Sequence, residues 1–141
     1  MKMIKIALLA LLTSISFLTQ AEDGQKALIT LTSEQQQTRG MAMVLANSMQ
    51  TQGVQVDVLL CDSAGDMALQ NYQSMPLKPK NVTPEQLMQK LIKSGASVKV
   101  CALYLPNAGK NKDALIEGVS VAKPPEMAKM LMAPNTKVFN F

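Results

Sequence analysis

Short apolar runs rich in β-branched residues alternate along the chain with stretches in which apolar residues recur every three or four positions. The short runs are expected to form strands, at residues 26–33, 54–60, 97–104, 118–122 and 136–141. The intervening stretches predict helices between residues 33 and 53, between 83 and 95, around 113–117 and over 125–132. Strands that are joined through helices run parallel, so the pattern predicts an α/β domain with a mostly parallel sheet.

Local signals mark the ends of the two main helices. Ser33 with Gln36 three residues later fits a capping box, in which two side chains satisfy free N–H groups of the first helical turn. Thr83, Pro84 and Gln86 form a second start signal, since proline is favoured at the first helical position. Between these helices, the segment 71–83 has two prolines and little periodicity and is expected to be a surface loop. The apolar face predicted for the first helix contains Met41, Val44, Leu45, Ser48 and Met49.

The N-terminal residues 1–21 have the three-part layout of a secretory signal peptide. Lys2 and Lys5 precede an apolar and hydroxyl stretch of about a dozen residues, which is shorter than the roughly 20 that a membrane-spanning helix needs. Cleavage is expected after Ala21, which would release residues 22–141 into the periplasm or the medium. The alternative is an uncleaved N-terminal anchor. After cleavage, no stable insertion into a membrane is expected.

Composition narrows the classes of function. Without Lys2 and Lys5 the chain has 12 basic and 10 acidic residues, and it has no basic block with interleaved aromatics, so no nucleic-acid partner is expected. Histidine is absent, which removes the usual general base at neutral pH and the commonest zinc ligand. Hydrolase mechanisms that depend on histidine or on zinc are therefore excluded.

Both cysteines lie near the carboxyl ends of predicted strands, where open α/β sheets place their functional crevices. Cys101 is the first candidate for a nucleophile or sulfur carrier, if a helix N-terminus, Lys110 or Lys112 lowers its pKa. Cys61 is the second thiol candidate, because the negative charge of Asp62 opposes formation of its thiolate. The alternative is that each cysteine fills the core as a small apolar side chain.

A disulfide between Cys61 and Cys101 is conceivable in an oxidising compartment. In a flavodoxin-like strand order the first strand lies between the second and third, which separates the two residues by about 9–10 Å. A disulfide needs Cα atoms within about 7 Å. We therefore expect two free thiols, unless the strand ends bend towards each other.

Other side chains suggest weaker alternatives. Met41 with Met43 and Met130 with Met132 resemble thioether pairs for Cu(I), although methionine on amphipathic helices commonly fills gaps in the core. Hydroxyl residues after the first strand could favour a flavin or a phosphate, but the segment has no glycine before position 40 to let the backbone wrap an anion. These hydroxyl residues are Thr30, Thr32, Ser33 and Thr38. Asp62 and Asp66 could act as paired carboxylates, but nothing in the sequence gives them a substrate, and solvated acids of a loop are the default explanation. No cofactor and no resident metal is expected.

Four stretches of the sequence resemble the DsrE/DsrF-like family of small sulfur-relay-type proteins. They are the opening strand and helix, VDVLLCDSAGDMAL at 56–69, VKVCALYLPNAG at 98–109, and the tail from 113 to 141, in which a short GV-type strand precedes a helix and a last strand. The resemblance implies a flavodoxin-like three-layer sandwich of about five strands over residues 22–141, and frequent homo-oligomers. It also implies a functional cysteine at the position of Cys101, which in sulfur-relay members carries a persulfide between partner proteins.

The chain departs from that family pattern in two ways. Some relatives have a second cysteine three residues later, where this sequence has Tyr104, which puts CxxC-type redox chemistry in doubt. Export would remove the cytoplasmic relay partners. The leading hypothesis is a periplasmic DsrE-like sulfur carrier or thiol-redox protein that uses Cys101 and exchanges sulfur with a donor or acceptor protein. The alternatives are a non-catalytic oligomeric or binding protein with structural cysteines, and a methionine-rich periplasmic copper-binding protein. A carrier or binding protein is more in keeping with the chain than a stand-alone enzyme.

Overall fold

The computed structural model describes residues 24–141, so the predicted signal peptide lies outside the described residues. Five strands form one sheet in which every neighbouring pair is parallel, in the order β4-β3-β2-β1-β5. The strands are β1 (Lys26–Leu31), β2 (Gln55–Leu60), β3 (Ser97–Val100), β4 (Val119–Val121) and β5 (Thr136–Asn140). The predicted α/β class, with a flavodoxin-like sandwich and about five strands, is confirmed.

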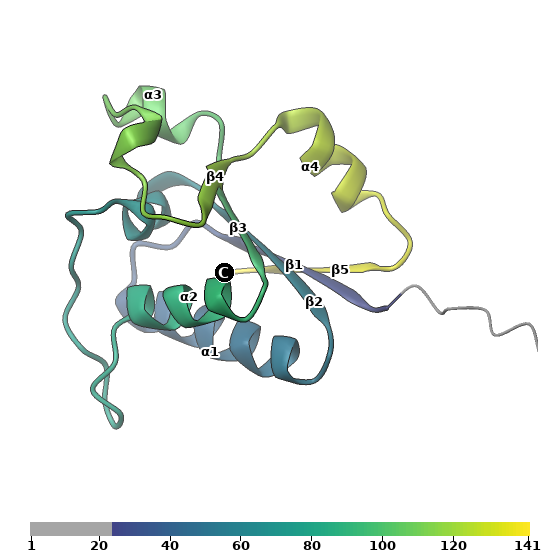
Figure 1. The fold of residues 1–141 in the computed structure, drawn as a ribbon, viewed down its shortest axis with the longest axis horizontal. Helices are drawn as coiled ribbons and strands as arrows, with labels where there is room; N and C mark the ends of the chain where they lie inside the picture. Colours follow the sequence, from purple (N-terminus) through teal and green to yellow (C-terminus); the bar gives the residue numbers. More distant parts are fainter. Residues whose placement is uncertain (1–23) are drawn as a thin grey trace, which may run out of the picture.

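Helices cover both faces of the sheet and make three layers. Helices α1 (Gln36–Thr51) and α2 (Pro84–Lys93) pack on one face, and α4 (Pro124–Leu131) packs on the other (Figure 1). Three short helical segments complete the chain: the 3-10 helix η1 (Asp62–Ala68), α3 (Tyr104–Asn107) and the 3-10 helix η2 (Lys112–Ala114). The helix predicted around 113–117 is thus only the short turn η2. The segment η1 follows β2 directly, and α3 comes shortly after β3, so both border the carboxyl edge of the sheet.

Alternation along the strands divides the apolar residues between two cores. Successive strand residues point to opposite faces, so Ala27, Ile29 and Leu31 of β1 join the large core beneath α1 and α2. Leu28 joins a smaller core with Ala122 and Met127 of the α4 side. Burial of both faces explains why residues 27–29 of β1 are apolar in succession rather than alternating with polar ones.

Helix α1 presents a different face to the core from the one predicted. Ala42, Met43 and Ala46 are fully buried, whereas Met41 and Val44 are about half exposed, at 54% and 45%. Small residues let the helix lie close to the sheet. Of the predicted stripe, Met41, Val44 and Leu45 face outward, whereas Met49 packs against the main core. The start of the helix also differs from the prediction.

The two predicted capping boxes had opposite outcomes. In α2, Thr83 accepts a hydrogen bond from the Gln86 N–H and the Gln86 side chain accepts one from the Thr83 N–H, so the prediction is confirmed. In α1 the N-cap residue is Gln35, without a side-chain cap. The Ser33 hydroxyl instead accepts from the Gln35 N–H at 3.0 Å, which closes a tight turn before the helix. The capping box predicted at Ser33 is therefore wrong.

Strand β3 ends at Val100 rather than at the predicted Tyr104, because the chain turns immediately after the strand. The Tyr104 N–H donates to Cys101 O at 2.9 Å, and Tyr104 begins α3. Cys101 is consequently the first residue beyond the strand, not a residue in its second half. Segment 71–83 is largely irregular, as expected, and includes a single bridge between Leu77 and Val82.

Candidate functional site

The register of the sheet places both cysteines at neighbouring positions on its carboxyl edge. Leu60 of β2 pairs with Val100 of β3, and each cysteine is the next residue along its strand. The Cys101 N–H donates to Leu60 O at 2.7 Å, which extends the ladder by one step. Adjacent strands lie about 4.8 Å apart. The prediction that β1 separates the two cysteines by twice that distance is wrong, because β2 and β3 are direct neighbours and β1 lies beyond β2.

The two thiols interact with each other but differ in their surroundings. Both are free and half-buried. Burial raises the pKa of Cys61 to about 12, and a hydrogen bond with the Cys101 thiol, the charge of Cys101 and the charge of Asp62 add to the effect. Cys61 therefore keeps its proton at neutral pH. The opposition of Asp62 to ionisation of Cys61, which the sequence predicts, is present in the structure.

Asp62 has an unusual backbone at this edge. Its φ is +51°, in the left-handed region that residues other than glycine rarely occupy and that aspartate tolerates better than most. The chain reverses direction there and enters η1. Residues held in sparsely populated backbone regions are frequent at functional sites. The turn keeps Cys61 at the strand end rather than letting β2 continue past it.

Both thiols line one open pocket of about 510 Å3 at the carboxyl ends of β2 and β3. Leu103, which is 71% exposed, stands at its edge. Its lining consists of Cys61, Asp62, Ser63, Asp66, Cys101, Leu103, Tyr104, Asn107 and Ala108. Among these described residues there are two carboxylates and no basic side chain. Lys110 and Lys112, considered from the sequence as groups that could activate Cys101, do not line the pocket.

Tyr104 closes one side of the pocket and fixes one of the two carboxylates. Its hydroxyl donates to Asp66 Oδ1 at 2.6 Å. Burial, followed by this hydrogen bond and the charge of Asp66, raises the pKa of Tyr104 above its usual range. The ring lies against Gly65, where an added Cβ would be 2.4 Å from Tyr104 Cδ2. Asp66 thus has Tyr104 as its hydrogen-bond partner, which the hypothesis of an Asp62–Asp66 carboxylate pair did not include.

A buried arginine ties together the loops that carry the site. Arg39 is only 4% exposed, and it donates to Ser33 O, to Ser63 O and to the Tyr72 hydroxyl, each at 2.7 Å. Its guanidinium also lies 5.8 Å from the centre of the Tyr72 ring, within the range of a cation–π contact. These contacts join the end of β1, the start of η1 and the long loop after it. Sequence reasoning missed Arg39, although a lone arginine among the small residues of α1 was a usable signal.

The hydroxyls that could have held a phosphate are partly used inside the fold. The Thr30 hydroxyl bonds to Asn140, the Thr32 hydroxyl donates to Phe141 O at 3.3 Å, and Ser33 makes the turn before α1. These three groups tie β1 to the end of β5 and shape the first loop. The structure therefore gives no support to a phosphate or flavin site there.

The methionine pairs are not brought together. Met43 is buried beneath α1 whereas Met41 is exposed, as expected for helical residues two positions apart. Met130 and Met132 belong to α4 and its end, on the opposite face of the sheet (Figure 1). A single Cu(I) ion cannot bind both pairs in one chain. In the part of the chain that the structure describes, no three histidine, cysteine or acidic side chains cluster as a metal site.

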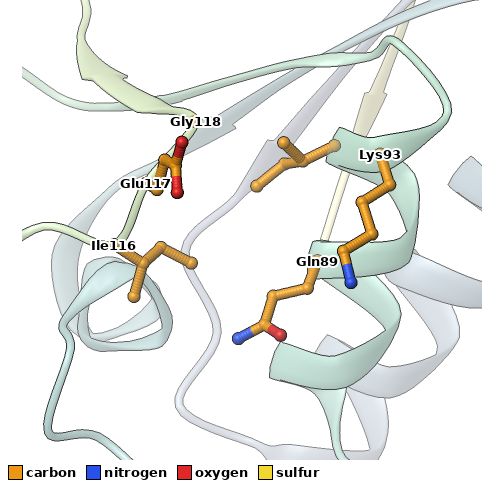
Figure 2. Close-up of a pocket in the computed structure, with 6 residues that line it drawn as sticks. Gln89, Lys93, Ile116, Glu117 and Gly118 are labelled. Carbon is orange, nitrogen blue, oxygen red and sulfur yellow. The ribbon is translucent and has the colours of Figure 1, made fainter.

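A second hollow, of about 450 Å3, lies between α2 and the segment before β4 (Figure 2). Figure 2 shows Gln89 and Lys93 projecting from α2 across from Glu117 and Ile116. Gly118 borders it, with φ +86° and room for no Cβ, since one would lie 2.6 Å from Ile92 Cγ2. Neither thiol lines this hollow, and its lining contains no cysteine, serine or threonine. The pocket with the two cysteines is therefore the candidate site.

Comparison with solved structures assigns the fold. The ychN protein from E. coli superposes with a TM-score of 0.68 at 18% identity, over 84% of this chain and 99% of that one. A protein of unknown function from Methanobacterium thermoautotrophicum, MTH1491, superposes with a TM-score of 0.61 at 12% identity, over 83% and 99% of the two chains. The superpositions extend over almost the whole of each neighbour, so the chain shares its α/β fold with these two proteins. At these identities the likeness shows the fold alone.

Comparisons at the level of sequence give no assignment. No family model matches the chain, and no curated protein matches it. Within residues 24–141, no helix combines the length and the apolar character needed to cross a bilayer.

Proposed function

We propose that this protein is an exported DsrE-like carrier whose Cys101 accepts and passes on sulfane sulfur or redox equivalents by thiol exchange with a partner protein. The observation that supports the proposal most directly is the position of Cys101 in an open pocket at the carboxyl edge of the sheet, beside a second thiol. A carrier needs a thiol that a partner can reach. The pocket supplies access without enclosing a small substrate.

Cys101 rather than Cys61 is the exchanging thiol in this proposal. The thiolate is the reactive form of cysteine, and Cys61, with a pKa of about 12, is almost wholly protonated at neutral pH. Leu103, exposed at the rim two residues after Cys101, offers a partner protein an apolar contact next to the reactive sulfur.

Export and self-association belong to the same proposal. Residues 1–21 would direct the chain to the periplasm or the medium, where thiol exchange meets an oxidising environment. Self-association is supported by the outward face of α1, where Met41, Val44 and Leu45 are exposed beside a broad groove that Met75 also lines. Exposed apolar clusters of this kind commonly mark interfaces. Light scattering of the wild type and of Val44→Glu would test the second point, and a monomeric wild type would contradict it.

Mass spectrometry of the protein purified from the periplasm tests the proposal. We expect a mass consistent with cleavage after Ala21, and rapid alkylation of Cys101 in the folded protein at neutral pH. Exposure to polysulfide should add mass in units of one sulfur atom at Cys101. Cys61→Ser is the matched control that retains this gain, and Cys101→Ser should lose it. A Cys101 that stays unreactive until denaturant is added overturns the proposal.

One observation favours the alternative of a non-catalytic binding protein with structural cysteines. Cys101 is half-buried and its side chain packs against the main core, as a small apolar residue would. In that case Cys101→Ala would lower stability without altering any cellular phenotype at permissive temperature. A phenotype in Cys101→Ser at normal protein abundance separates the two functions in favour of the carrier.

A further inference from the structure

Cys61 and Cys101 occupy positions that a disulfide can join without moving the strands. Their neighbours Leu60 and Val100 are registered partners, and the Cys101 N–H continues the ladder to Leu60 O at 2.7 Å. The strand spacing of about 4.8 Å falls within the Cα separation of about 4.4–6.8 Å that disulfides require. Both thiols also line the same pocket. The two sulfur atoms are therefore close enough to form a bond with each other.

The environment of the pair gives the two sulfurs unequal roles. Cys61 is followed by Asp62, whose left-handed backbone turns the chain at the end of the strand. Cys101 is followed by the exposed Leu103 at the rim of the pocket. Both thiols are half-buried and line the same pocket, so a sulfur atom loaded on Cys101 lies next to the protonated Cys61. This is the arrangement of an attacking thiol and a resolving thiol.

We propose that Cys61 resolves a persulfide carried by Cys101, releasing sulfide and leaving a disulfide between Cys61 and Cys101. The inference rests on the proposed function, because it needs sulfur to be loaded on Cys101. In the step, a bond forms between Cys61 Sγ and Cys101 Sγ, and the bond from Cys101 Sγ to the outer sulfur breaks. Cys61 gives its proton to the outer sulfur as it attacks, so its thiolate, the reactive form, arises only in this step. The electron pair of the broken bond goes to the outer sulfur, which leaves as hydrogen sulfide.

The step needs no external oxidant or reductant, because the outer sulfur and the two cysteine sulfurs exchange electrons with each other. The sulfane sulfur is reduced to sulfide, and the two cysteine sulfurs are oxidised to the disulfide. A dithiol protein or small dithiol then reduces the disulfide by exchange and is itself oxidised to a disulfide, which restores both thiols. The pair thereby converts sulfane sulfur and a dithiol into sulfide and a disulfide when no acceptor removes the sulfur first.

Intact-mass spectrometry of the reduced, processed protein tests this step. The wild type and Cys61→Ser are each loaded with inorganic polysulfide, desalted, and followed over time for mass and for released sulfide. Both should gain one sulfur atom on Cys101. The wild type should then lose that sulfur, release about one sulfide per chain and end two hydrogens lighter than its reduced form. In Cys61→Ser the persulfide should persist at least tenfold longer, with no sulfide released.

Controls separate this inference from the function on which it rests. Cys61→Ala repeats the experiment without a hydroxyl, and circular dichroism of both variants verifies that they fold. Equal persistence of the persulfide in wild type and variants, with no disulfide formed, overturns the resolving role of Cys61 and leaves the carrier function standing. Failure of Cys101 to load in any of the proteins overturns both proposals.

Discussion

The variant Arg39→Met tests whether one buried cation stabilises the loops of the site. Its guanidinium donates to Ser33 O, Ser63 O and the Tyr72 hydroxyl, at 2.7 Å in each case, and it is 4% exposed. Methionine keeps much of the aliphatic stem but has no donor. The variant therefore loses all three bonds and leaves two carbonyl oxygens and a hydroxyl without their partner.

The expected loss in the free energy of unfolding is the difference between the contribution of the hydrogen bonds and the desolvation cost of the guanidinium. A hydrogen bond to a charged group contributes about 1.5–3 kcal/mol to stability. Against this, burial of the guanidinium costs several kcal/mol of desolvation, which methionine removes. Three bonds of this strength exceed that cost, so we expect Arg39→Met to lower the free energy of unfolding by about 2–4 kcal/mol.

Urea denaturation followed by circular dichroism measures this loss, and two further variants make it specific. Tyr72→Phe removes one acceptor and should cost about 1 kcal/mol. The double variant should lose less than the sum of the single losses, because the bond between Arg39 and Tyr72 can be lost only once. Arg39→Lys keeps the charge but not the planar set of donors, so it should recover only part of the stability.

Three results would refute this reasoning. A loss of under about 1 kcal/mol in Arg39→Met would mean that desolvation cancels the three bonds. Strict additivity of the double variant would mean that Arg39 and Tyr72 are not coupled, contrary to the 2.7 Å contact between them. Full recovery by Arg39→Lys would show that the charge alone is sufficient.

Three further predictions concern the pocket itself. Gly65→Ala places a Cβ 2.4 Å from the Tyr104 ring and should cost about 1–3 kcal/mol in urea unfolding; unchanged stability would contradict the packing described. Cys101→Ala should lower the pKa of Cys61 from about 12 towards its ordinary 9.0, though only in part because burial remains; an alkylation rate of Cys61 with an unchanged pH profile would count against this. Folding raises the pKa values of Cys61 and Tyr104, so their contribution to stability is present below about pH 9 and falls as the pH rises towards 12. Urea midpoints measured across this pH range should therefore decrease, and the decrease should be smaller in Cys61→Ala.

Local sequence signals predicted a helix start correctly where the only requirement was to satisfy the free N–H groups of the first turn. Thr83, Pro84 and Gln86 satisfy the free N–H groups of a helix start, and the structure contains that capping box. Ser33 and Gln36 have the same spacing, yet the Ser33 hydroxyl bonds to the Gln35 N–H in a turn. The difference is tertiary, because Arg39 occupies Ser33 O and fixes the path of the loop. The spacing of Ser33 and Gln36 alone could not reveal the contact between Arg39 and Ser33 O.

The outward face of α1 shows a related limit. Apolar periodicity identifies a helix but does not say which of two apolar faces meets the sheet. Met41, Val44 and Leu45 offer more apolar area, yet Ala42 and Ala46 are buried because small side chains allow close approach. The exposed stripe is consistent with a further partner for this helix, and the sequence alone contained no means of distinguishing that role from a core.

The pairing of the two cysteines depends on strand order, which neither periodicity nor spacing determines. Forty positions separate Cys61 from Cys101 in the sequence, and they become neighbours only because β2 and β3 are adjacent and in register at Leu60 and Val100. The sequence raised doubt about CxxC-type redox chemistry because Tyr104 stands where some members of the family it resembles have a second cysteine. The structure contains no such motif and instead places two thiols on neighbouring strands. Tyr104 serves a different purpose, bonding to Asp66, and the second thiol of the site comes from the neighbouring strand.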